Sequence, residues 1–244
     1  VKNNEIIDIG VDFSLFNPKI KEGYVRKKFG LSKNDIIIFQ PRGFREIYNN
    51  EIILNSISIV KKTYPNVKYI FCGYYEQECS FKDNIAKLGI KENVIFIGRL
   101  SRNKELPFYY RDSNIVISIP DSDSSPLSVF EAMACKTPVL LSKLPWLNYK
   151  FNNIKFPYIR KIEVESLAKK TIDIIDNPLI ANVDLLYNIV YQNINAVIGI
   201  DIPAEESYWK IASLNNGIFP IIADDPKIEQ FYRNAMYKGN IFAT

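Results

Sequence analysis

The chain has 244 residues, of which 47% are hydrophobic and 24% charged, enough for one large domain, or for one domain and part of a second. Its 31 basic and 27 acidic side chains give a net charge of only +4 without long basic tracts, so no nucleic-acid partner is expected. The absence of histidine excludes Ser-His-Asp and Cys-His catalysis, and no apolar run reaches the roughly 18 residues of a membrane span.

Short apolar runs alternate with longer amphipathic segments from residue 36 onward. Apolar residues on both faces predict buried parallel strands at 36–39, 67–72, 94–98, 115–119 and 139–141. Helical periodicity predicts helices at 50–64, 80–88, 104–112, 126–135 and 163–175. The alternation predicts an α/β fold over residues 1–180, a Rossmann-like doubly wound parallel sheet whose ligands bind at the carboxyl ends of the strands.

The last part of the chain, residues 181–244, is expected to form an additional α/β segment. Residues 195–223 echo residues 114–141 at an offset of 81 to 82, with strand, helix and strand in the same order. The echo is either an eroded repeat of that unit or the ordinary likeness between two such units. It has Ala212 or Ser213 where the first copy has Glu131, so no ligand role is expected for it.

The loop after the strand at 115–119 contains Asp121-Ser122-Asp123. Two carboxylates in this spacing can hold Mn²⁺ or Mg²⁺ under a nucleotide diphosphate, because hard oxygen ligands suit those ions. A second interpretation needs no metal. The acids run directly into a helix, and the start of that helix can bind phosphate by itself.

The start of this helix carries the residues of the metal-free interpretation. Ser125 is expected to cap the helix, with Pro126 at its first position. The free amides of Leu127 and Ser128 would then point at a phosphate, supported by the helix dipole. Glu131 lies about one turn further in, where its carboxylate could accept two hydrogen bonds from a ribose diol.

Several motifs resemble those of glycosyltransferase family 4, whose fold is GT-B. The stretch SPLSVFEAMACKTPV at residues 125–139 resembles the signature of that family. IGVDFSLFNP at 9–18 is similar to the motif that opens the family's C-terminal domain, and NVIFIG at 93–98 and YRDSNIVI at 110–117 match in the same order. The resemblance covers roughly residues 8–178 and identifies them as a donor-binding domain.

The resemblance implies a retaining, metal-independent transfer of sugar from a nucleotide-diphospho-sugar, the co-substrate, to a hydroxyl of a glycan or lipid-linked acceptor. It assigns the acceptor to an N-terminal domain that we expect to be missing, since the chain opens on Val1, and we therefore expect this fragment alone to be inactive. A cytoplasmic location is expected because the three cysteines lack metal spacing and are typical of buried thiols. Peripheral association of the full-length enzyme with the inner face of the membrane stays open.

The resemblance also implies roles for the two acids. Glu131 is expected on the ribose hydroxyls, and Asp123 stands where the family has its first glutamate, near the donor sugar. We expect Asp123 and Arg42 to be the catalytic residues. Lys136 stands where the family usually has a glycine, which predicts an altered turn after the helix.

The diphosphate requires cations, and the resemblance places them after the first strand. Arg42 is expected to neutralise the diphosphate, together with Gly43 and Arg45 in the same loop. The family's lysine position falls on Ile47. The nucleobase loop contributes two further candidate binding residues, Arg99 and Leu100.

Two other functions remain open at this point. One is a metal-dependent transferase of the GT-A type that uses Asp121 and Asp123. The other is a non-catalytic nucleotide-binding or assembly module, which Ile47 at the lysine position and the shorter acid Asp123 both favour.

Overall fold

The computed structural model describes residues 10–73, 78–124, 126–151, 154–155 and 157–193. The chain divides into two units, residues 11–192 and residues 1–10 with 193–244. The described residues belong almost entirely to the first unit, so the echo at 195–223 lies outside them and the domain boundary at residue 180 stays a prediction. Within the described ranges no helix combines the length and the apolar character that a membrane span requires.

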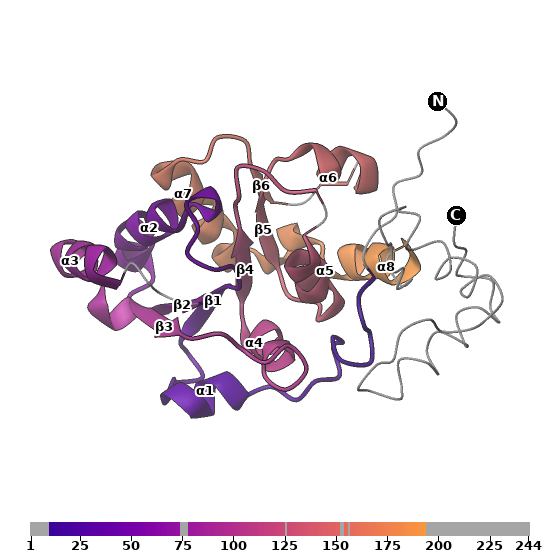
Figure 1. Ribbon diagram of the computed structural model, residues 1–244, viewed down its shortest axis with the longest axis horizontal. Coiled ribbons are helices and arrows are strands. Elements are labelled where there is room, and N and C mark those ends of the chain that lie inside the picture. Colours follow the sequence, from indigo (N-terminus) through magenta and orange to yellow (C-terminus); the bar gives the residue numbers. More distant parts are fainter. Residues whose placement is uncertain (1–9, 74–77, 125, 152–153, 156, 194–244) are drawn as a thin grey trace, which may run out of the picture. The chain divides into compact units, whose positions relative to one another are not determined.

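Six parallel strands form one sheet in the order β3-β2-β1-β4-β5-β6 (Figure 1). This is the strand order of a Rossmann-like doubly wound sheet, so the predicted fold class is confirmed. All five predicted strands are present with their ends within one residue of the expected ones, whereas β6 was not predicted. The strands are β1 Ile36–Gln40, β2 Val67–Cys72, β3 Val94–Ile97, β4 Ile115–Ser118, β5 Val139–Ser142 and β6 Tyr158–Ile159.

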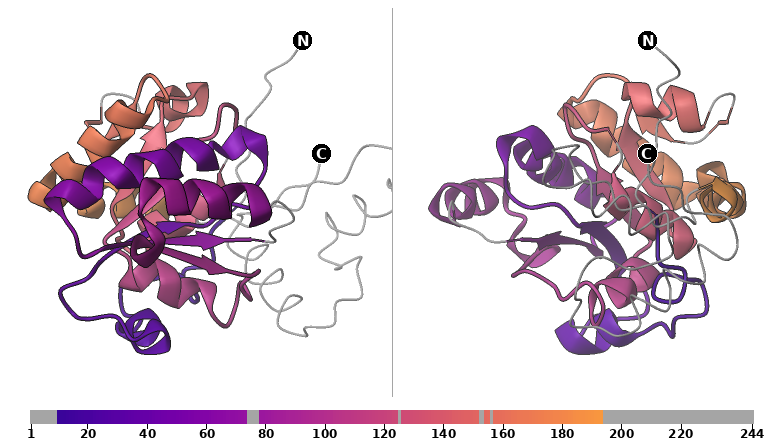
Figure 2. Two further views of the ribbon diagram at one scale, coloured as in Figure 1. Left: turned by 90° about the vertical axis from the view of Figure 1, so that its left-hand side faces the viewer. Right: turned by 45° about the vertical axis from the view of Figure 1, so that its right-hand side comes forward.

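Helices cover both faces of this sheet, with α2, α3 and α7 on one face and α4 and α5 on the other (Figures 1 and 2). These five are the predicted helices. The α-helices are α1 Tyr24–Phe29, α2 Asn50–Thr63, α3 Glu78–Leu88, α4 Leu106–Asp112, α5 Leu127–Ala134, α6 Pro145–Lys150, α7 Val164–Asp176 and α8 Val183–Asn193. Short 3-10 helices are η1 Glu46–Tyr48, η2 Lys91–Asn93 and η3 Pro178–Ala181.

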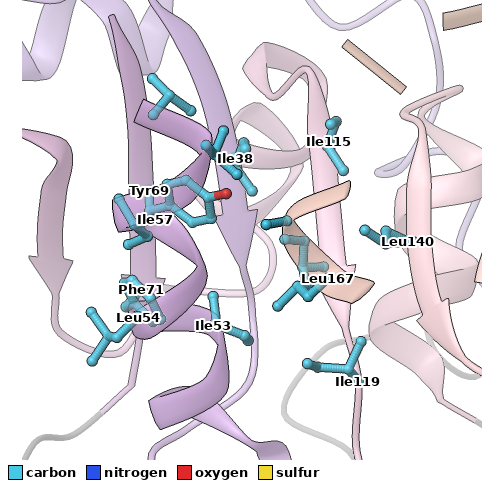
Figure 3. Packing of buried hydrophobic residues seen from close by; sticks show 14 of the residues in the cluster. Ile38, Ile53, Leu54, Ile57, Tyr69, Phe71, Ile115, Ile119, Leu140 and Leu167 are labelled. Atoms are coloured by element: carbon cyan, nitrogen blue, oxygen red, sulfur yellow. The ribbon is translucent and has the colours of Figure 1, made fainter. Parts of the chain in front are cut away.

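The two faces of β1 show why its apolar run is continuous. Ile38 is buried in the main core with Ile57 of α2 and Leu167 of α7 (Figure 3). Its neighbour Phe39 points to the opposite face, where its ring lies 5.5 Å from that of Tyr109 in α4. Successive side chains of a strand alternate between faces, so a strand covered on both sides must be apolar at every position.

Helix α1 depends on a residue far away in the sequence. The Asp112 carboxylate at the end of α4 accepts hydrogen bonds from the amides of Gly23 and Val25, each at 2.6 Å. It therefore satisfies two donors at the start of α1 that the helix itself leaves unpaired. A helix of six residues is too short to show a helical period in the sequence, and Asp112, the residue that caps it, is distant in the chain.

The turn after α5 keeps a left-handed geometry without glycine. Lys136 has φ 56°, and its amide donates to the carbonyl of Met133 at 2.9 Å. Lys136 thus adopts the left-handed conformation that glycine usually provides, so the prediction that it alters this turn is wrong. The side chain has partners in α8, since Nζ lies 2.6 Å from the Asp184 carboxylate and 5.0 Å from the centre of the Tyr187 ring.

Candidate functional site

The site lies where the strand order changes direction. β1 has β2 on one side and β4 on the other, and the chain leaves β1 and β4 toward opposite edges of the sheet. In doubly wound sheets this divergence opens a crevice outside the carboxyl ends of the two central strands. The loop after β1 contains Arg42, and the loop after β4 contains Asp121 and Asp123, so this edge brings together the predicted loops.

Hydrogen bonds join these two loops directly. The Asp121 amide donates to the Ile47 carbonyl at 3.0 Å. The Asn49 side-chain amide donates to the Ile119 carbonyl at 2.9 Å and to the Asp121 carboxylate at 3.0 Å. Asp121 therefore holds one loop against the other, which is a structural role that its D-x-D spacing did not suggest.

Arg42 is the centre of a polar cluster at the start of α5. Its Nη1 lies 2.9 Å from the Asp123 carboxylate and 3.4 Å from Ser128 Oγ. Its Nη2 donates to the Tyr48 hydroxyl at 3.1 Å, and the guanidinium lies 4.5 Å from the centre of the Tyr48 ring. A planar guanidinium that is held by Asp123, Ser128 and the side chain of Tyr48 is a well-oriented cation.

Helix α5 begins one residue later than predicted. Its first residue is Leu127, and Pro126 occupies the cap position in extended geometry without a side-chain cap hydrogen bond. Ser125, the predicted cap, lies outside the described residues. The Val129 amide is the first to bond back, to the Pro126 carbonyl at 2.9 Å. The amides of Leu127 and Ser128 precede this first bond, as a helix N-terminus requires.

Glu131 is buried, with only 3% of its side chain exposed. Its Oε1 lies 2.8 Å from Nε of Arg102, and its Oε2 accepts a hydrogen bond from the Tyr110 hydroxyl at 3.1 Å. Burial raises the pKa of Glu131 above its ordinary value, although Arg102 and Tyr110 act in the opposite direction. Since Ser128 and Glu131 are three residues apart in α5, both lie on one face of the helix.

The raised pKa of Glu131 predicts a pH dependence of stability. A folded-state pKa above the unfolded value near 4.5 means that the folded protein binds this proton more tightly. The stability contributed by protonated Glu131 is therefore present below about pH 4.5 and is lost as pH rises through the folded pKa. We expect the free energy of unfolding of wild type, relative to Glu131→Gln, to fall across this window in urea titrations. A difference that rises with pH would contradict the burial effect.

The other predicted binding residues have diverse surroundings. Gly43 lies close to Gly73, where an added Cβ would come 2.8 Å from the Gly43 Cα. Arg45 is exposed and precedes η1. Arg99 is exposed and Leu100 half-buried in the loop after β3, and the described contacts do not connect either of them to Arg42 or to Glu131. The structure thus clusters Arg42, Asp123 and Ser128, and leaves Arg99 apart from that cluster.

Four residues of the site were missed in the sequence. Tyr48 and Asn49 follow Ile47, which stands at the lysine position. Arg102 lies in the loop after β3, and Tyr110 lies in α4. Tyr110 opens the YRDSNIVI motif, which was the only signal that pointed to one of them. Asn49 and Arg102 have no local pattern, because each acts on a residue of a distant segment, and Tyr48 contacts Arg42 within its own loop.

No group of three or more Cys, Asp or Glu side chains that could hold a metal ion is found within the part of the chain that the structure describes.

The chain was compared with families of known proteins. Residues 23–192 match the model of the family described as "Glycosyl transferases group 1". The chain belongs to this family. The family confirms the predicted relationship to GT-B glycosyltransferases, and the matched segment contains Arg42, Asp123 and Glu131.

Two curated relatives show how far the sequences have diverged. The chain is 26% identical over 141 residues to a putative glycosyltransferase, EpsD, of Bacillus subtilis, covering 57% of this chain and 36% of EpsD. It is 26% identical over 147 residues to the alpha-monoglucosyldiacylglycerol synthase of Streptococcus pneumoniae, covering 59% and 33%. The matched part thus spans about a third of the length of these relatives.

Solved structures of group 1 and other glycosyltransferases share the fold. The C-terminal domain of LpcC from Francisella tularensis, a group 1 family protein, has a TM-score of 0.64 at 20% identity, covering 75% of this chain and 97% of that domain. HepE of Anabaena in complex with UDP-glucose has a TM-score of 0.65 at 16% identity, covering 76% and 52%.

Proposed function

We propose that this unit binds a nucleotide-diphospho-sugar and that the longer protein transfers the sugar to a hydroxyl acceptor. The observation that carries the proposal is one face of α5 at the switch point of the sheet. It presents free amides, the hydroxyl of Ser128 with the Arg42 cation beside it, and the buried carboxylate of Glu131, in that order along the helix. A phosphate followed by a ribose has the same order of groups.

The diphosphate would bind at the start of α5. The amides of Leu127 and Ser128 and the dipole of the helix favour an anion there. Arg42 adds a full charge beside them, in a position held by Tyr48. A bidentate guanidinium suits phosphate geometry, so Arg42 can act without the lysine that Ile47 replaces.

The ribose would bind at Glu131. An ionised carboxylate only accepts hydrogen bonds, and a vicinal diol presents two donors. The fully buried Tyr110 holds one carboxylate oxygen and thereby fixes the orientation of the group. This orientation supports recognition of a ribonucleotide in preference to a deoxyribonucleotide.

A metal-independent site is supported by the partners of the two aspartates. Asp123 forms an ion pair with Arg42, and Asp121 accepts a hydrogen bond from Asn49. Each carboxylate therefore already has a protein side chain as its partner, in the position that a metal ion would otherwise occupy. With Asp123 and Arg42 adjacent, we propose that Asp123 contacts the donor sugar and that Arg42 stabilises the charge of the departing diphosphate.

The known relatives are consistent with such a donor. HepE of Anabaena is solved with UDP-glucose, and the pneumococcal relative is a synthase of a glucosylated diacylglycerol. We propose a glycan or lipid-linked hydroxyl acceptor, bound by a separate N-terminal domain of the longer protein. Transfer is proposed to proceed with retention, in the cytoplasm, without a cofactor.

Thermal unfolding with UDP, GDP or ADP and EDTA tests the binding proposal. A nucleotide that binds only the folded state raises the melting temperature. We expect one of the three to do so in EDTA. Stabilisation by none of them, or only with added Mn²⁺ or Mg²⁺, would contradict the proposed site.

A second function is favoured by Ile47, which stands at the lysine position and leaves Arg42 as the cation of the cluster. A domain that binds nucleotide without turnover would fit this substitution. Transfer of sugar by the full-length protein distinguishes the two, because a binding module would show nucleotide-dependent stabilisation and no product.

A further inference from the structure

The carboxylate proposed to bind ribose already has two partners within the protein. Tyr110 is fully buried and donates to Oε2 from behind. Arg102 approaches Oε1 with Nε at 2.8 Å and is 46% exposed, whereas Glu131 is 3% exposed. Of the two partners of the carboxylate, the arginine is therefore the one that solvent or a ligand can reach.

Among the described residues, Arg102 has one ion pair and one ring contact. It lies in the loop between β3 and α4, and its guanidinium is 5.4 Å from the centre of the buried Phe16 ring. Glu131 is the carboxylate with which it pairs among the described residues. The half-exposed guanidinium can return to water, unlike the buried Tyr110, so the cost of breaking the pair falls on the buried Glu131 unless another donor replaces the arginine.

We propose that Arg102 occupies the position of the ribose diol in the ligand-free protein, and that a nucleotide must displace it to reach Glu131. The inference rests on the proposed function, because it assigns Glu131 to the ribose. The diol brings two donors in place of one guanidinium N–H, and Tyr110 keeps its hydrogen bond. A ligand without the diol leaves Arg102 paired with Glu131, so the ion pair opposes only the ligand that carries the diol.

The test compares Arg102→Met with wild type by isothermal titration calorimetry. Methionine keeps an apolar side chain on Phe16 and removes the guanidinium. The probes are UDP, GDP and ADP, each with its 2′,3′-dideoxy analogue, all titrated at one fixed pH. Arg160→Met is the matched control, because Arg160 is an exposed arginine beside Tyr158 at β6.

We expect the affinity ratio of the ribonucleotide over its dideoxy analogue to rise about tenfold in Arg102→Met, which corresponds to about 1.4 kcal/mol. The ratio cancels the general effect of removing a positive charge near an anionic ligand. Arg160→Met should leave the ratio unchanged. An unchanged or lower ratio in Arg102→Met overturns the inference, and a lower ratio would assign Arg102 to the bound nucleotide.

A second measurement needs no ligand. The pKa of Glu131, followed by NMR of its side-chain carboxyl carbon, should rise in Arg102→Met because the cation that favours the ionised form is gone. No rise means that the ion pair does not exist and overturns the inference. Binding that is indifferent to Glu131→Ala instead overturns the proposed function, so the two failures are distinguishable.

Discussion

Replacing Glu131 with alanine should weaken the binding of the nucleoside diphosphate by about 1.5–3 kcal/mol, or about 10- to 150-fold in Kd. The ribose diol loses the ionised acceptor of its hydrogen bonds, and bonds of this kind are stronger than neutral ones. We expect a value toward the lower end, because the variant no longer has to displace Arg102 from an ion pair. Titration calorimetry in EDTA measures the loss.

Two variants serve as controls for this result. Glu131→Gln should lose less, because an amide oxygen still accepts a hydrogen bond. Asp121→Asn keeps an acceptor for Asn49 and removes the charge that a metal would need, so it should bind like wild type. If Asp121→Asn abolished binding, Glu131→Ala spared it, and Mn²⁺ or Mg²⁺ were required, the site would be a metal centre.

Replacing Arg42 with methionine should weaken the binding of the nucleoside diphosphate by about 2–4 kcal/mol and leave the binding of the matching nucleoside unchanged. The variant removes the cation beside the diphosphate. It also leaves Asp123 without its partner, so a carboxylate then faces the phosphates and repels them. Parallel titrations with the diphosphate and the nucleoside separate the loss of phosphate contacts from a general loss of structure.

The double variant Arg42→Met with Asp123→Asn should recover part of this loss, because the uncompensated carboxylate is gone. Arg45→Met is the matched control, since Arg45 is exposed in the same loop and is the alternative cation for the diphosphate. A larger loss from Arg45→Met than from Arg42→Met would show that the diphosphate lies elsewhere in the loop. An equal loss of affinity for the nucleoside and for the diphosphate in Arg42→Met would also contradict the assignment.

The elements that sequence analysis predicted are those whose signal is local. β2 and α2 are long enough for their apolar periodicity to be read directly, and their predicted ends differ from the observed ones by at most one residue. α1 and α6 escaped because six residues are too few to show a helical period, and β6 because it has only two residues. α8, with eleven residues, was also not predicted. The start of α5 was placed one residue early because proline is favoured at the first helical position, whereas Pro126 occupies the cap position.

Within the site, the motif that contains Ser128 and Glu131 was recognisable because both residues lie on one helix at fixed spacing. Arg42 was assigned from the resemblance to the family, which has an arginine after its first strand. The interpretation of Asp121 as a metal ligand or a bystander missed its hydrogen bond with Asn49, which fastens two loops. Nothing in the D-x-D spacing distinguishes these roles, because the deciding partner comes from another part of the chain.

The amino-acid sequence alone determined the doubly wound sheet and the helix face that carries the candidate site, since periodicity and capping act over a few residues. Only the tertiary structure decided which charges meet. Arg42 and Asp123 are 81 residues apart, and Arg102 and Glu131 are 29 apart. These pairs form because the sheet order places the ends of β1 and β4 side by side, and because α5 buries Glu131 beneath the loop after β3. A contact between loops depends on the register of every strand that supports them, which no local pattern encodes.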